Sequence, residues 1–281
     1  MGEVQMSIKY ERDKQEIKNI ILYSFGKIIS VFGTAIYSFA LSLYVLKITG
    51  SAFSFAITLV LGVIPAIIMN PFAGVIADKV NKKTLVVVMD FLSGILLVIV
   101  YFVCMNYELN LIIIYSTTFL LTVFSNFFGI GLEAAKPNVV SESMLMNINS
   151  ISRILDSVSL ILGPMLGGIV FVIFDIETFI IVNGVSFILS GLLMMCIHFK
   201  LFQDQSNEGS SNGKIHWIRD IKDGFYYLIE RKRIKNMFII FIFINFFLGF
   251  AVTVPLSYII NIVLKLRSEE FGIIQAPFQL E

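Results

Sequence analysis

Five ionisable side chains stand inside long apolar runs of this 281-residue chain, where they could form ion pairs or carry protons: Lys27, Asp90, Glu133, Arg153 and Asp156. A charge in the middle of a membrane-spanning helix costs roughly 2.5–3.5 kcal/mol on insertion scales, and such residues usually mark pathways or paired sites. Lys27 and Asp90 lie at similar depth and could pair, and Arg153 and Asp156 are three residues apart on one helix face. We expect an inner gate in which Asp90, Glu133 or Asp156 changes protonation. The alternative is a static network whose end residues reach water.

The elements that must position these side chains are seven apolar runs, each long enough to cross a bilayer as a helix. About 20 residues at about 1.5 Å per residue span the roughly 30 Å hydrocarbon core, and backbone groups there must hydrogen-bond within the segment. The composition agrees, because 57% of the residues are hydrophobic and only 15% are charged, whereas soluble domains carry about 25% charged residues. The sequence therefore predicts an all-α polytopic membrane protein with spans at 20–46, 53–76, 84–105, 111–134, 152–174, 178–199 and 237–264.

Basic residues gather in the amino-terminal segment and in every second loop. Lys9, Arg12, Lys14 and Lys18 precede the first run, and more Lys and Arg follow the second, fourth and sixth runs, whereas the alternate loops are nearly free of them. Because Lys and Arg favour the cytoplasmic side, we expect a cytoplasmic amino terminus and a location in the plasma membrane. A net charge of +1 gives no indication of nucleic-acid binding.

A long polar connection divides the chain. Its first part is rich in Ser, Asn and Gly, as in a flexible linker. Its second part, from Trp217 to Ile229, places apolar residues on one helical stripe, which predicts an amphipathic helix on the inner leaflet; a short soluble helix is the alternative. The first and seventh runs both begin Lys-Asn and end Val-Leu-Lys, a weak internal repeat of the kind that transporters use. We expect a cytoplasmic segment, a six-span half, a linker and the start of a second half, at 1–19, 20–199, 200–236 and 237–281.

The loop after the second run reads Gly74-Val75-Ile76-Ala77-Asp78-Lys79-Val80-Asn81-Lys82-Lys83. It resembles the signature loop of the major facilitator superfamily, Gly-x-x-x-Asp-Arg/Lys-x-Gly-Arg/Lys-Arg/Lys, and the matching positions are Gly74, Asp78, Lys79, Lys82 and Lys83. Asn81 stands where the family usually has Gly, although Asn tolerates a left-handed backbone better than most residues. The resemblance implies that Asp78 helps to latch two halves of a transporter on the cytoplasmic side. A merely basic loop would explain the lysines but not the Gly and Asp.

The fifth run carries a second resemblance, to the Gly-Pro-rich motif of exporter branches of that superfamily, at Gly163, Pro164, Gly167 and Gly168. Gly163 and Gly167 form a small-xxx-small pair that permits close helix approach, and Pro164 permits a bend. The broader pattern resembles the macrolide-efflux and siderophore-exporter branch. That resemblance implies proton-coupled efflux of a hydrophobic or amphipathic small molecule.

Polar side chains near the middle of the runs stand among many Phe: Tyr37, Tyr101, Asn126 and Asn245. An aromatic, sparsely polar cavity suits such a solute, although ordinary packing is the alternative. We find no nucleophile constellation and no metal-ligand spacing, so we expect no enzyme, no cofactor and no metal site. The expected partners are the lipid bilayer, a small-molecule substrate and protons, with no nucleic acid.

Two other interpretations remain open. A seven-helix receptor would place its amino terminus outside the cell, whereas the loop charge here places it inside. The superfamily normally has twelve spans, and this sequence ends at Glu281, where an eighth span would develop. The third interpretation is therefore a truncated, transport-inactive fragment whose C-terminal half is missing, which would leave Asp78 without its usual partner.

Overall fold

The structure is a computed structural model that describes residues 2–106, 110–199, 201, 226 and 230–248. The chain divides into two compact units, Met1–Ile215 and His216–Glu281. The first unit contains all five of the charged residues singled out within apolar runs.

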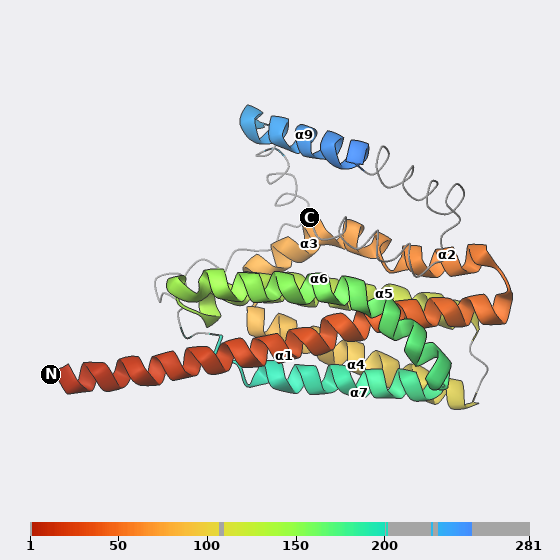
Figure 1. Cartoon of the computed structure of the whole chain (residues 1–281), viewed down its shortest axis with the longest axis horizontal. Helices are drawn as coiled ribbons and strands as arrows, with labels where there is room; N and C mark the ends of the chain where they lie inside the picture. Colours follow the sequence, from red (N-terminus) through yellow and green to blue (C-terminus); the bar gives the residue numbers. More distant parts are fainter. Residues whose placement is uncertain (1, 107–109, 200, 202–225, 227–229, 249–281) are drawn as a thin grey trace, which may run out of the picture. The chain divides into compact units, whose positions relative to one another are not determined.

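Helices make up the first unit, and no strand occurs among the residues that the structure describes (Figure 1). Among the described residues, six stretches are long and apolar enough to cross a membrane, which confirms the prediction of an all-α polytopic membrane protein. The helices are α1 (Gly2–Thr49), α2 (Ala52–Leu61), α3 (Ile64–Lys79), α4 (Lys82–Asn106), α5 (Leu111–Val139), α6 (Glu142–Ile173) and α7 (Ile176–Met195).

Large apolar side chains cover the outside of these helices. Ile67 is 66% exposed, Ile112 75% and Val172 82%. A protein in water rarely leaves so many large apolar groups uncovered, whereas lipid tails solvate them and backbone groups are satisfied inside each helix. This outer surface therefore contacts the bilayer.

α1 is 48 residues long and begins well before the predicted span at 20–46. The expected cytoplasmic segment 1–19 forms the first part of this helix, which begins at residue 2. Its Glu, Lys, Gln and Arg residues are good helix formers. The helix stops at Gly50, whose φ of 62° is left-handed and whose N–H donates to the Leu46 carbonyl at 2.8 Å, a common way to end a helix. α1 contacts α2, α5, α6 and α7, so it packs against helices from both ends of the unit's sequence.

The second predicted span, 53–76, coincides with an apolar stretch at Ala52–Asn70 that is long enough to cross a membrane, but it is not one continuous helix. The chain breaks between α2 and α3, at Gly62 and Val63, and Pro65 lies in the first turn of α3. Proline has no N–H and is best accommodated in the first turn of a helix, which fits a new helix beginning there. α2 starts at Ser51, whose hydroxyl accepts from the Ser54 N–H at 3.3 Å.

Glycines bring two pairs of helices close together. A Cβ placed on Gly94 of α4 would lie 2.8 Å from the Gly184 carbonyl oxygen of α7. A Cβ placed on Gly163 of α6 would lie 2.6 Å from the Ala35 Cβ of α1. Small residues permit such backbone approach inside membranes. As a result, polar groups on neighbouring helices come within hydrogen-bonding reach.

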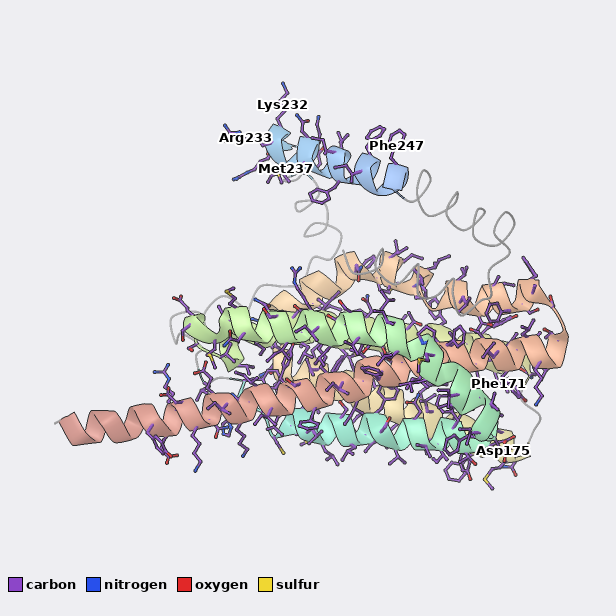
Figure 2. The ribbon with its side chains drawn as sticks, in the orientation of Figure 1. Phe171, Asp175, Lys232, Arg233, Met237 and Phe247 are labelled. Carbon is purple, nitrogen blue, oxygen red and sulfur yellow. The ribbon has the colours of Figure 1, made fainter. Side chains whose placement is uncertain are left out.

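α6 bends in its C-terminal half (Figure 1), and Pro164 lies inside this helix. Sharp bends usually have a proline as their cause. The bend turns the last part of α6, where Phe171 lies, toward Asp175 at the beginning of α7 (Figure 2).

In the second unit the structure describes α9 (Lys232–Leu248), a helix of 17 residues. Lys232 and Arg233 occupy its first turn and Phe247 lies near its last (Figure 2). It coincides with the start of the predicted span 237–264. Residues 249–281, with the expected start of an eighth span, lie outside the described residues, as does nearly all of the predicted amphipathic helix.

Candidate functional site

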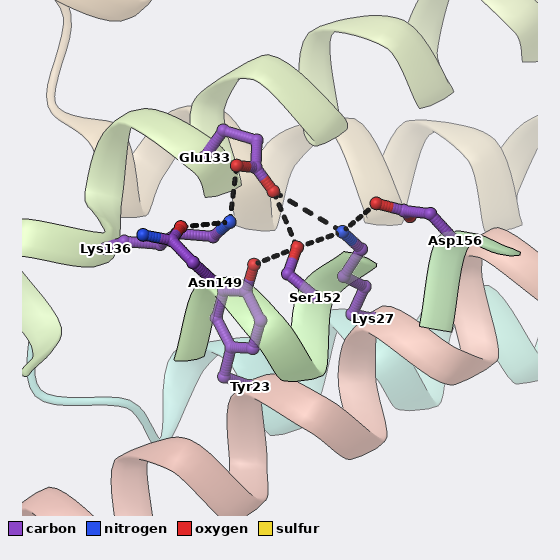
Figure 3. A network of polar contacts seen from close by, with 7 residues as sticks. All are labelled: Tyr23, Lys27, Glu133, Lys136, Asn149, Ser152 and Asp156. Atoms are coloured by element: carbon purple, nitrogen blue, oxygen red, sulfur yellow. Dashed lines mark hydrogen bonds and ion pairs between the residues drawn. The ribbon is translucent and has the colours of Figure 1, made fainter. Parts of the chain in front are cut away.

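A cluster of charged and polar side chains joins α1, α5 and α6 (Figure 3). Lys27 Nζ lies 2.8 Å from Asp156 Oδ2 and 3.4 Å from Glu133 Oε1, and it also donates to Ser152 Oγ. Ser152 Oγ in turn donates to Glu133 Oε1 at 2.7 Å. An ammonium group has three hydrogens, and these three acceptors engage all of them.

Glu133 also holds a second cation. Its Oε2 accepts from Lys136, one turn further along α5, and Lys136 Nζ donates to Asn149 Oδ1 at 3.0 Å. The buried Tyr23 donates its hydroxyl to Ser152 Oγ at 3.2 Å. The cluster therefore contains two ammonium groups and two carboxylates, and its formal charges cancel.

Helical periodicity explains how these side chains meet. Residues three or four apart lie on one helix face, and the members follow this spacing on each helix: Tyr23 and Lys27 on α1, Glu133 and Lys136 on α5, and Asn149, Ser152 and Asp156 on α6. The glycine contact between α6 and α1 brings two of these faces together.

Burial differs sharply between the two signs of charge. The Lys27 side chain is 6% exposed, whereas the side chains of Glu133 and Asp156 are 50% and 52% exposed. A buried ion is tolerated only when it is paired, and removing one partner of a buried pair is costly. Lys27 is thus the buried centre of the cluster, and the two carboxylates lie half-exposed at its edge.

The expected pair between Lys27 and Asp90 does not form. Lys27 faces α5 and α6, whereas Asp90 lies within hydrogen-bonding distance of Ser30 and Ser190, on α1 and α7. Similar depth along a helix does not fix which side of it a residue faces. Asp156 pairs with Lys27, and no ion pair joins it to the exposed Arg153 among the contacts of the described residues.

The signature-loop residues fall at the end of α3 and the start of α4. Gly74, Asp78 and Lys79 lie within α3, and their side chains are outside the described part of the chain, so the predicted latch stays a prediction. Lys82 is half-buried in the first turn of α4. Lys83 Nζ donates to the carbonyl groups of residues 195 and 197 at 2.6 and 3.0 Å. It therefore satisfies free carbonyl groups at the end of α7, as cations at helix C-termini do.

Asn81, the departure from the family pattern, has its own role. Its Oδ1 accepts from the Thr84 N–H at 3.2 Å, which is the capping bond that Asn makes at helix N-termini. Glycine has no side chain to make this bond. The substitution therefore adds a cap to α4.

The Gly-Pro motif contributes packing between α6 and α1. A Cβ on Gly167 would lie 3.0 Å from the Ile36 carbonyl oxygen, whereas one on Gly168 would meet only Phe39 Cε1, at 3.8 Å. Pro164 is exposed at the bend of α6. The motif thus sets the distance and direction of α6 against α1.

The predicted cavity residues have different surroundings. Tyr37 is 1% exposed and its ring stacks on Phe179, with 6.2 Å between the centroids, so it belongs to the packed core. Asn126 and Tyr101 are half-buried. Asn245 lies in α9, and its side chain is outside the described residues.

A cavity of about 300 Å³ at the ends of α1 and α6, which no sequence pattern predicted, is lined by Tyr44, Lys47, Phe171 and Glu177, among others. Lys47 Nζ lies 5.8 Å from the centre of the Phe171 ring, within the range of a cation–π contact.

Four members of the Lys27 cluster were missed by the sequence reasoning: Tyr23, Lys136, Asn149 and Ser152. Their signal is present in the sequence, because residues 149, 152 and 156 form a polar stripe at helical spacing. Within the part of the chain that the structure describes, no three His, Cys, Asp or Glu side chains gather closely enough to hold a metal ion.

Known proteins resemble this chain over most of its length. The family model for the Major Facilitator Superfamily matches residues 23–280. Macrolide efflux protein A of Streptococcus pyogenes is 23% identical over 210 residues, which cover 74% of this chain and 50% of that protein. The uncharacterized MFS-type transporter YkuC of Bacillus subtilis is 24% identical over 242 residues, or 84% of this chain and 55% of that protein. The chain thus spans about half the length of these two relatives.

Proposed function

This chain belongs to the major facilitator superfamily, and we propose that it acts in proton-coupled efflux of a hydrophobic or amphipathic small molecule by alternating access. The observation that carries the proposal is the cluster in which one buried cation, Lys27, is held by two half-exposed carboxylates on two other helices.

The chain crosses the plasma membrane with its amino terminus in the cytoplasm. The distribution of Lys and Arg supports this orientation. In this orientation the cluster lies toward the cytoplasmic side, because Lys27 is in the amino-terminal half of the predicted span 20–46 and Lys136 is in the last turn of α5.

The substrate class is a bulky, largely apolar solute. The relative named for macrolide efflux supports this class, and so does a composition with 27 Phe residues, since sites for such solutes are mostly apolar and aromatic.

The Lys27 cluster acts as the inner gate. Protonation of Glu133 or Asp156 removes one of the two negative charges that hold Lys27, and the ion pair between helices is lost. α1 is then held less firmly against α5 or α6, which permits opening. Loss of the proton restores the pair and closes the gate. Because the two carboxylates are half-exposed, protons reach them through water.

Transport into inside-out membrane vesicles tests the proposal. With the vesicle interior acidified, vesicles that contain the full chain should accumulate a radiolabelled macrolide, and Lys27→Met should abolish the accumulation. Lys14→Met is the matched control, because Lys14 is an exposed residue on the same helix. It should transport normally.

The two possible failures are distinct. Accumulation by the unaltered chain no greater than that of empty vesicles would contradict transport by this chain. Equal accumulation by the Lys27→Met variant and the unaltered chain would contradict the gate and leave transport intact.

A further inference from the structure

A second buried polar group lies where α1, α4 and α7 meet. Asp90 is 1% exposed. Its Oδ1 is 2.8 Å from Ser30 Oγ and its Oδ2 is 2.6 Å from Ser190 Oγ. The two hydroxyl oxygens are 2.8 Å apart, and Ser190 Oγ is also 3.0 Å from the Gly26 carbonyl oxygen. Four short oxygen–oxygen contacts therefore connect three helices.

Each of these contacts needs a hydrogen between its two oxygens to be a hydrogen bond. Ser30 and Ser190 supply one hydroxyl hydrogen each. If Asp90 were ionised, only two of the four contacts could be hydrogen bonds, and Ser190 could not donate both to Asp90 and to Gly26. A proton on Asp90 Oδ2 provides a third hydrogen: Asp90 donates to Ser190, Ser190 to the Gly26 carbonyl, and Ser30 to Asp90 Oδ1.

No cation offsets a negative charge at this position among the described residues. Lys27, the nearest charged residue of α1, directs its ammonium to Glu133 and Asp156. Lys136 of α5 is engaged with Glu133. A buried ionised carboxylate without a cationic partner is costly, whereas a hydrogen-bonded neutral acid is not.

The remaining charges on the helices packed against Asp90 are distant. Lys82 and Lys83 lie eight and seven residues away on α4, about 10–12 Å along the helix axis, and Lys83 is bound to the end of α7. Glu177 lies thirteen residues before Ser190 on α7, about 20 Å along the axis.

We propose that Asp90 is a proton-binding site and that the neutral acid, through Ser30, Ser190 and the Gly26 carbonyl, fastens α4 and α7 to α1. A hydronium ion in the surrounding water donates the proton: its O–H bond breaks and leaves a water molecule, and a new O–H bond forms at the carboxylate oxygen Oδ2. The site is separate from the gate around Lys27. The site depends only on the fold of the first unit, and it is present whether or not the chain transports a solute.

Infrared spectroscopy of the purified full chain in detergent at neutral pH tests the proposal directly. The spectrum of the unaltered chain minus that of Asp90→Asn should contain the carbonyl band of a protonated carboxylic acid, which moves to lower frequency in heavy water. The matched variant Asp156→Asn should remove only carboxylate bands. If the substitution Asp90→Asn instead removes a carboxylate band and no acid band, the proposal is overturned.

A second variant does not depend on how well Asp90→Asn folds. Ser190→Ala leaves the acid in place but removes the hydroxyl that accepts its hydrogen. The acid band should therefore shift to higher frequency and not disappear. Identical acid bands in Ser190→Ala and the unaltered chain would contradict the assignment of that band to Asp90.

Stability measured against pH supplies a further readout. Raising the pH removes the proton, so the thermal midpoint of the unaltered chain should fall as the solution becomes alkaline. Asp90→Asn cannot lose a proton there, and one of its amide hydrogens can replace the acid hydrogen that Asp90 donates to Ser190. Its midpoint should change less over the same range; parallel curves for the two proteins would contradict a proton-dependent link between these helices.

Discussion

Neutralising the two carboxylates around Lys27 should destabilise the chain. Removing Lys27 as well should restore part of its stability, because the buried Lys136 also loses Glu133 in that background. In Glu133→Gln/Asp156→Asn, the Lys27 ammonium keeps Ser152 but loses both negative charges, while its side chain stays 6% exposed. Leaving a buried charge unpaired costs about 3–5 kcal/mol. Lys27→Met then removes that charge at nearly constant volume, and buried ion pairs replaced by apolar groups are often neutral in stability.

The sign of the Lys27→Met effect is therefore predicted to depend on the background. In the unaltered chain the substitution leaves two carboxylates that are half-exposed and hydrated, so it should be neutral or destabilising. In the doubly neutralised chain it should stabilise by about 3–5 kcal/mol. Chemical unfolding in detergent, followed by circular dichroism, measures both values, with Lys14→Met as the control in each background. A destabilising Lys27→Met effect in both backgrounds would refute the view that Lys27 is a buried cation held by these carboxylates.

Two further predictions concern packing and hydrogen bonding. Gly163→Ala should destabilise by about 1–3 kcal/mol, the usual range for overpacking, because its Cβ would meet the Ala35 Cβ at 2.6 Å. Gly168→Ala should change little, because its Cβ would make only an ordinary contact with Phe39, at 3.8 Å. Equal unfolding midpoints for the two variants would contradict the close contact. Asn19 is fully buried and donates to the carbonyl groups of residues 139 and 198 at 3.1 and 3.2 Å. Asn19→Leu should therefore cost about 1–3 kcal/mol through unsatisfied carbonyl groups, while the exposed Asn106→Leu should be near neutral in the same unfolding assay.

Much of the helical architecture follows from the sequence alone. The length and composition of the apolar runs predict spanning helices because nothing else satisfies the backbone in lipid, and α4, α5 and α7 lie close to their predicted positions. The break between α2 and α3 was missed because an apolar window averages over Gly62 and Pro65. The extension of α1 was missed because its first turns are polar, and hydropathy ends a span where the lipid ends, not where the helix does.

The sequence predicts which charged residues belong to the site, but it does not predict which of them pair with one another. Lys27, Glu133 and Asp156 stand out because charges are rare in spans. Their partners depend on the rotation of each helix about its own axis. The glycine contacts between helices fix this rotation, and it cannot be read from the sequence. Asp90 therefore was assigned to Lys27 by depth alone, although it faces α7.

Site-directed thiol labelling tests the central claim, a bundle that crosses the membrane with Lys27 and its carboxylates near the cytoplasmic face. A membrane-impermeant maleimide should label the native Cys196, exposed after α7, and Ser143→Cys, at the start of α6, only from the cytoplasmic side. It should label Asn110→Cys and Asp175→Cys only from the outside. Labelling of all four positions from the same side would contradict the account.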